Sequence, residues 1–178
     1  MINFIQPYDY NLNIGKAYNE AIKPLEGWIC LTDQDTLKFE GFAQRVKTII
    51  ETVDEMTILT CMTNRLRRNN KQVLSEYFNE SDINVHQDVF ERLWTTYGTT
   101  LTDADVIAGV CMIFHKSAWD KIKFTHNTVT FDRIFSHQAM QQGYKLRLAK
   151  GLYIFHLYRW GKDDPENNIA HLVKNHYI

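Results

Sequence analysis

The sequence of 178 residues contains little of what marks unfolded, fibrous, disulfide-bonded or membrane-spanning chains. Three prolines and eight glycines exclude collagen-like and low-complexity chains. The three cysteines, Cys30, Cys61 and Cys111, are an odd number and lie in apolar runs, which favours buried thiols in a reducing compartment over a disulfide framework. No apolar run approaches the ~18 residues that a membrane span needs, and MINFIQPYDY does not resemble a signal peptide. We therefore expect a cytoplasmic protein without a membrane span.

A charge excess of either sign is also lacking. Lysine and arginine total 20 against 21 acidic residues, which gives a formal net charge of -1 and no general attraction to nucleic acid or anionic lipid. With 44% hydrophobic and 13% aromatic residues, the chain can bury a full core. We expect one domain over residues 1–178, with a polar tail over 159–178, and no nucleic-acid partner.

Apolar runs and helical spacings alternate along the chain. The runs that predict strands cover residues 2–6, 28–31, 57–62, 105–116, 144–149 and 152–158, and the spacings that predict helices cover 15–23, 42–53, 83–97, 116–122 and 131–142. Ser81 or Asp82 is the expected N-cap of the third helix, and Gly98 its end. This order favours an α/β fold with a mostly parallel mixed sheet and helices on both faces.

Asp33 and Asp35 directly follow the predicted strand 28–31. Ligands in such sheets bind beyond the carboxyl ends of the strands, and two carboxylates there can hold Mg²⁺ or Mn²⁺ against a diphosphate. His156, in the last predicted strand, is a candidate third ligand. The alternatives are a solvated turn for the aspartates and a core histidine bonded to a carbonyl for His156.

Asp132 lies at the start of the helix predicted over 131–142. It is a candidate general base that accepts a proton from an attacking hydroxyl, or an acid that only stabilises the helix dipole. Gly109, in the predicted strand 105–116, would let a substrate approach the backbone closely.

Other residues near the predicted strand ends are candidates for binding a substrate. Lys16 can contact a phosphate or be an exposed lysine, and Tyr8, beside Pro7, can stack on a base or cap the first strand. Asn64 and Arg65 can bond sugar hydroxyls or phosphate, or Arg65 can belong to a solvated basic loop.

Three further candidates are expected to contact the acceptor. Trp119 can offer its face to a sugar or be buried, and Tyr158 and Arg159 follow His156 closely at the end of the last predicted strand.

Several segments together carry a resemblance to a known family. NIGKAYNEAI, WICLTDQDTL, AGVCMIFHKSAW, FDRIFSHQAMQQGYKL and GLYIFHLYR resemble short family 2 glycosyltransferases of the GT-A fold. The resemblance extends from Pro7 to Arg159, and it includes a helix with a glycine and an asparagine, here Gly15 and Asn19, before an Asp-x-Asp turn. It implies that Gly15 and Asn19 contribute to nucleotide binding.

The same resemblance implies roles for the acidic residues and the histidine. Asp33 and Asp35 would form the metal and nucleotide-diphosphate site, and His156 would complete the metal sphere. Asp132 would be the base that deprotonates the acceptor in inverting members.

The expected function is therefore a Mn²⁺- or Mg²⁺-dependent transfer of a sugar from a nucleotide-diphosphate donor to a hydroxyl acceptor, such as a glycan or surface polysaccharide. A sugar nucleotidyltransferase is one alternative, since related folds use metal-bound phosphates. A non-catalytic carbohydrate-binding or degenerate transferase module is another, favoured by the small size and by the apparent absence of the family's second strand.

Overall fold

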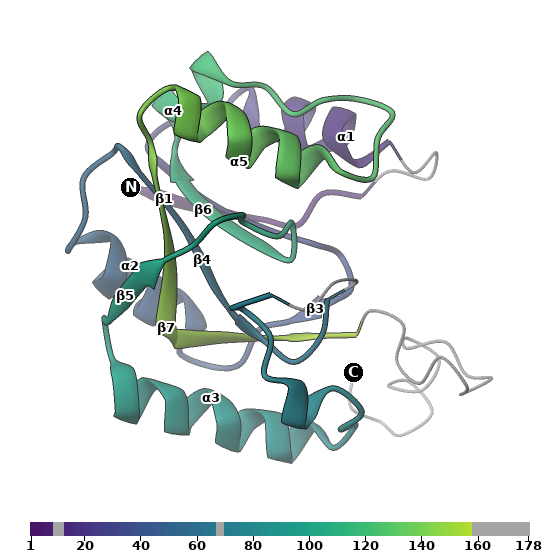
Figure 1. Ribbon diagram of the computed structural model, residues 1–178, viewed down its shortest axis with the longest axis vertical. Coiled ribbons are helices and arrows are strands. Elements are labelled where there is room, and N and C mark those ends of the chain that lie inside the picture. Colours follow the sequence, from purple (N-terminus) through teal and green to yellow (C-terminus); the bar gives the residue numbers. More distant parts are fainter. Residues whose placement is uncertain (9–12, 67–69, 158–178) are drawn as a thin grey trace.

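The chain is an α/β protein in the computed structural model, which describes residues 1–8, 13–66 and 70–157 (Figure 1). Its strands are β1 (Ile2–Ile5), β2 (Trp28–Thr32), β3 (Thr36–Leu37), β4 (Thr57–Thr63), β5 (Leu101–Asp103), β6 (Cys111–His115) and β7 (Lys145–His156). Its α-helices are α1 (Ile14–Ile22), α2 (Phe42–Ile50), α3 (Ile83–Tyr97), α4 (Lys116–Lys121) and α5 (Phe131–Gln141). A 3₁₀ turn, η1, covers Ser75–Tyr77.

The strands form one mixed sheet in the order β1-β2-β6-β4-β7-β3, with β5 paired to β7. The expectation of a mixed sheet is confirmed, but the expectation that it is mostly parallel is wrong, because only β1/β2 and β4/β7 pair in parallel, whereas β2/β6, β6/β4, β7/β3 and β7/β5 are antiparallel. The four strands β1, β2, β4 and β7 do run in one direction, and β6 is inserted between them in reverse. An apolar run specifies burial but not strand direction, so the sequence pattern could not reveal this reversal.

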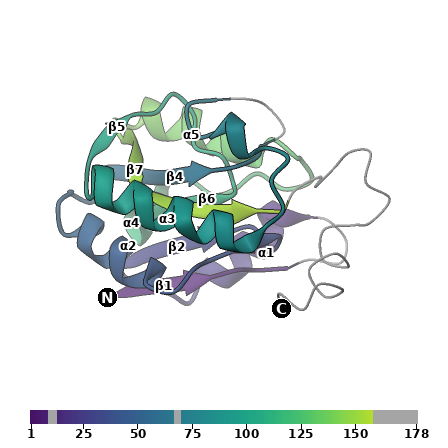
Figure 2. The same cartoon turned by 90° about the horizontal axis from the view of Figure 1, so that it is seen from below.

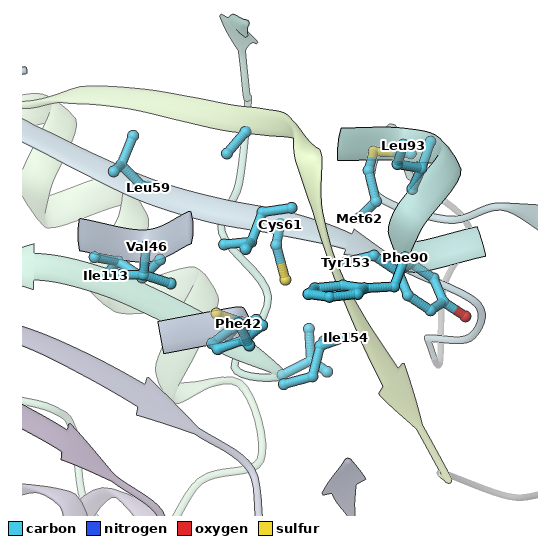
Figure 3. Close-up of a cluster of buried hydrophobic side chains, with 14 of the residues drawn as sticks. Phe42, Val46, Leu59, Cys61, Met62, Phe90, Leu93, Ile113, Tyr153 and Ile154 are labelled. Carbon is cyan, nitrogen blue, oxygen red and sulfur yellow. The ribbon is translucent and has the colours of Figure 1, made fainter. Parts of the chain in front are cut away.

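Helices cover both faces of the sheet, as predicted (Figures 1 and 2). Alternate residues along a strand face the two sides. On one face, α2 and α3 pack against the sheet with a cluster that includes Phe42, Cys61 and Phe90 (Figure 3). On the other face, α1, α4 and α5 bury a second cluster, which includes Tyr18 and Phe135. The three cysteines are buried as free thiols, as expected.

Two predicted strands differ from the structure near the site. The run 105–116 yields a strand only from Cys111, and the segment before it is irregular. The last two predicted strands are one continuous strand, β7, whose register against β4 shifts where Cys61 pairs with Ala149 but Met62 pairs with Tyr153. The short strands β3 and β5 were not predicted, because two or three residues are too few to show alternation.

Helix boundaries follow the expected signals. Asp82 is the N-cap of α3, with its carboxylate accepting a hydrogen bond from the Asn84 N–H at 2.8 Å, and Gly98 follows the last turn with φ of 48°. Among the described helices, none is long and apolar enough to cross a membrane. The predicted polar tail over 159–178 lies outside the described residues.

Candidate metal centre and cleft

One edge of the sheet collects the carboxyl ends of β2, β4 and β7. Because β6 is antiparallel to β2, with Thr32 opposite Cys111, the irregular segment before β6 reaches the same edge. A cleft of about 800 Å³ opens there. Seven of the residues proposed from sequence line it: Pro7, Tyr8, Asp33, Asp35, Gly109, Asp132 and His156.

The turn that carries Asp33 and Asp35 is held by hydrogen bonds to its backbone. Gln6, at the end of β1, donates its side-chain N–H to the Asp33 carbonyl at 2.8 Å, and the Thr36 hydroxyl donates to the same carbonyl at 2.6 Å. Thr36 then pairs with His156 across β3 and β7, and the N–H of Leu157 bonds the Asp35 carbonyl at 2.9 Å. The short strand β3 therefore brings the aspartate turn to the end of β7.

His156 is 5% exposed and has a defined orientation. Its Nδ1 lies 2.7 Å from the Arg65 carbonyl oxygen, and since a carbonyl only accepts, Nδ1 carries a proton. Its backbone N–H donates to the Asn64 side-chain oxygen at 2.8 Å. The other ring nitrogen, Nε2, faces Asp35 Oδ1 at 3.3 Å. This arrangement, a carbonyl on one ring nitrogen and a carboxylate site on the other, is typical of metal-binding histidines.

The three side chains have the composition of a divalent-metal site. Asp33, Asp35 and His156 each offer one ligand atom, and these atoms lie within 4.8 Å of one another. Two carboxylates with one imidazole fit Mn²⁺ or Mg²⁺, while the imidazole favours Mn²⁺ of the two. The residues present therefore fit the cation that the sequence predicts.

The pKa shifts reflect burial of several charges in one place. Burial raises the pKa of Asp33 to about 6, although the neighbouring His156 opposes the change. Burial would also raise the pKa of Asp35, but the hydrogen bond and charge of His156 outweigh it and the pKa is lowered. Burial opposes a charge on His156, yet Asp35 and then Asp33 raise its pKa. Negative charge is thus concentrated at the cluster, which a bound cation would stabilise.

Asp132 occupies the first turn of α5 and faces the same cleft. Its Oδ2 accepts the Gly109 N–H at 3.0 Å and its Oδ1 accepts the Arg133 N–H at 2.7 Å. Burial raises the pKa of Asp132 in spite of these bonds. Both carboxylate oxygens are oriented, and the raised pKa makes the ionised group a better proton acceptor.

Gly109 separates the metal cluster from Asp132. A Cβ at this position would lie 2.9 Å from Phe131 Cζ and 3.5 Å from Asp33 Oδ1. The missing side chain therefore lets the Asp33 carboxylate, the Phe131 ring and the backbone pack together. The substrate approach at Gly109 stays a prediction.

Four residues expected to bind nucleotide or acceptor do not line the cleft. Gly15 packs on the Thr125 carbonyl, where a Cβ would come within 2.1 Å, and Lys16 is paired with Glu20 at 3.8 Å. The Asn19 Oδ1 accepts the Trp119 indole N–H at 2.8 Å, and Trp119 is 5% exposed. These contacts fasten α1 to α4, through Trp119, and to the segment between α4 and α5, through Thr125.

Asn64 and Arg65 also lie outside the cleft lining and are fully buried. Both support His156, Asn64 through its side-chain oxygen and Arg65 through its carbonyl. The Arg65 guanidinium donates from Nε to the Phe78 carbonyl at 2.7 Å. Tyr158 and Arg159 fall outside the described residues.

Several residues that line the cleft or support the aspartate turn were not predicted from the sequence. Tyr18 donates its hydroxyl to Asp33 Oδ1, and Gln6 and Thr36 hold the aspartate turn. A signal existed for Tyr18, because Ile14, Tyr18 and Ile22 recur every four residues and so share one face of α1. The apolar or neutral residues Leu66, Asn70, Val106 and Val129, and the cation Arg133, complete much of the lining.

No profile of a protein family matches this sequence, and no curated protein matches it. The functional interpretation therefore depends on the geometry of the cleft together with the motif resemblance.

Proposed function

We propose that the chain is a metal-dependent glycosyltransferase that moves a sugar from a nucleotide-diphosphate donor to a hydroxyl acceptor. The observation that carries this proposal is the convergence of Asp33, Asp35 and His156 within 4.8 Å in a cleft that also contains Asp132. The family resemblance implied this grouping from residues more than 120 positions apart in the chain, 33 and 156.

The cluster and the base have separate tasks in this reaction. Asp33, Asp35 and His156 would hold the divalent cation, which when bound would supply positive charge against the departing diphosphate. Gln6 and Thr36 hold the backbone of the aspartate turn, and the Arg65 carbonyl orients the His156 ring, so the cluster is arranged before any substrate binds.

Asp132 takes the proton of the acceptor hydroxyl in the proposed step. The acceptor oxygen forms a bond to the anomeric carbon, and the bond from that carbon to the phosphate oxygen breaks, with its electron pair leaving on the nucleoside diphosphate. The transition state resembles an oxocarbenium ion, as at other anomeric centres. The Gly109 and Arg133 N–H groups hold the base in place while the proton moves.

An assay of nucleoside diphosphate release tests the proposal. Purified protein with Mn²⁺ and a panel of nucleotide-sugars is expected to release nucleoside diphosphate, faster with acceptor sugars, and chelation by EDTA is expected to stop it. Pyrophosphate release from a nucleoside triphosphate would instead indicate a nucleotidyltransferase. Donor binding without turnover over many acceptors would indicate a non-catalytic module.

The variant Asp132→Asn separates catalysis from binding. Removal of a general base is expected to lower turnover by about 10² to 10⁴-fold, with donor affinity in calorimetry retained. Asp88→Asn is the matched control, because Asp88 is exposed on α3, on the face of the sheet opposite α5. Full activity of Asp132→Asn would exclude Asp132 as the base.

A further inference from the structure

Tyr18 links helix α1 to the aspartate turn. It is 1% exposed, and its ring contacts Phe124 and Phe131 edge to face, with centroids 5.6 and 5.3 Å apart. Its hydroxyl donates to Asp33 Oδ1. The two edge contacts hold the buried Tyr18 ring in place, so its hydroxyl keeps a fixed position against the Asp33 carboxylate.

The helix that carries Tyr18 is itself anchored. The Asn19 side chain accepts the Phe124 N–H at 3.1 Å and donates to the Phe124 carbonyl at 2.8 Å, so that it bonds the backbone as a neighbouring strand would. Gly15 lies against the Thr125 carbonyl one turn earlier. These contacts fix α1 against the segment that leads to α5, which also supplies Phe131.

Two protein groups lie close to Oδ1 of the Asp33 carboxylate. Tyr18 donates to this oxygen, and the Gly109 backbone lies close enough that a Cβ there would be 3.5 Å from it. Within the described part of the chain, no donor bonds the second oxygen, Oδ2. Oδ1 of Asp33 is thus bonded within the protein, whereas Oδ2 is available to a ligand.

We infer that Tyr18 is a positioning residue of the metal centre, which orients Asp33 by binding Oδ1 and leaves Oδ2 for the cation. This inference rests on the metal site of the proposed function, although it requires no particular sugar or acceptor. Tyr18 corresponds to the Arg65 carbonyl at His156: each engages one polar atom of a ligand side chain and thereby orients the other. Such supporting bonds determine how well a site is formed before the ion binds.

The test measures Mn²⁺ affinity of the wild-type chain and of two tyrosine variants. Tyr18→Phe keeps the ring contacts and removes only the hydroxyl. Tyr153→Phe is the matched control, because the Tyr153 hydroxyl is also buried and bonded, to His86 at 2.6 Å, on the α3 face of the sheet. Binding of Mn²⁺ alone, and of Mn²⁺ with each common nucleoside diphosphate, is followed by electron paramagnetic resonance and calorimetry.

Tyr18→Phe is expected to weaken Mn²⁺ binding by about 10 to 100-fold, the usual effect of losing a supporting bond to a ligand, and Tyr153→Phe is expected to leave it unchanged. Both variants should melt at a lower temperature without metal, because each loses a buried hydrogen bond. Only Tyr18→Phe should show a smaller rise in melting temperature when Mn²⁺ is added.

The outcomes distinguish this inference from the proposed function. Wild-type affinity for Mn²⁺ in Tyr18→Phe would overturn the role of Tyr18 and leave the metal centre intact. An equal loss in Tyr153→Phe would also overturn it, because the effect would then be general destabilisation. Absence of Mn²⁺ binding by the wild type under every condition would overturn the metal centre and, with it, the role of Tyr18.

Discussion

His86 and His156 are two buried histidines, and their partners differ. His86 is fully buried and stacks on the Phe155 ring with centroids 3.8 Å apart. Its Nδ1 pairs with the Tyr153 hydroxyl at 2.6 Å and its Nε2 with the Glu80 carbonyl at 3.1 Å. The Tyr153 hydroxyl and the Glu80 carbonyl are both neutral, and burial lowers the pKa of His86.

His156 has one neutral partner, the Arg65 carbonyl, but its Nε2 faces a carboxylate that is itself beside a second carboxylate. Its pKa is raised rather than lowered. Burial therefore does not distinguish a structural histidine from a candidate ligand. What distinguishes them is whether the second ring nitrogen is satisfied by a neutral group or belongs to a cluster of acidic side chains in a cleft.

Removal of the carboxylate beside His156 should have the largest effect. Asp35→Asn is expected to abolish metal-dependent donor binding, because the cluster loses the charged ligand that lies 3.3 Å from Nε2. Calorimetric titration of the nucleotide-sugar in the presence of Mn²⁺ measures this loss. His86→Gln is the control and should bind the donor as the wild type does. Unchanged donor affinity in Asp35→Asn would mean that His156, like His86, is a structural histidine and not a metal ligand.

Truncation of His86 should affect stability and not the metal. His86→Ala is expected to lower the free energy of unfolding by about 2 to 4 kcal/mol, because it leaves a cavity against Phe155 and deprives the Tyr153 hydroxyl and the Glu80 carbonyl of a partner. Urea unfolding measures this cost. Mn²⁺ affinity should stay at the wild-type value, and a parallel loss of affinity would show that His86 supports the cluster.

The position of the candidate site could be predicted from the sequence because it depends on local pattern. Asp33 and Asp35 follow an apolar run, and carboxyl ends of strands that run in one direction meet at one edge. The family resemblance selected His156, whereas the pattern of apolar residues alone does not show that His156 and not His86 meets the aspartates. His86 lies on a helix face, His156 ends a strand, and only the pairing of Thr36 with His156 across two strands determines which one meets the aspartates.

Other parts of the site depend on contacts between distant segments. The spacing along α1 predicts a buried face, but the partner of the Tyr18 hydroxyl depends on where α1 packs against β2. Asn19 and Trp119 bond across 100 residues, and neither spacing nor composition specifies such a contact. The direction of β6, which brings Gly109 to the cleft, likewise depends on the path of the chain after α3.

The smallest expected effect is a pH dependence of stability that belongs to His86. Burial, the first cause, lowers the pKa of folded His86 below its ordinary value of 6.5, although Glu80 and Asp82 oppose the shift while Arg65 adds to it. Between the folded and the ordinary pKa the unfolded chain binds more protons, so falling pH favours unfolding. The contribution of His86 is therefore complete above pH 6.5 and declines as the pH falls toward the folded pKa.

His86→Gln isolates this contribution, since glutamine retains a donor and an acceptor but does not titrate in this range. The difference in unfolding free energy between the wild type and His86→Gln, measured in urea at a series of pH values from 8 down to 5, should be constant at the upper end and shift against the wild type below pH 6.5. Because His156, Asp33 and Asp35 are present in both chains, their titration cancels in the difference. A difference that stays constant across the series would mean that His86 titrates alike in the folded and unfolded chains, and that its neutral partners do not set it apart from His156.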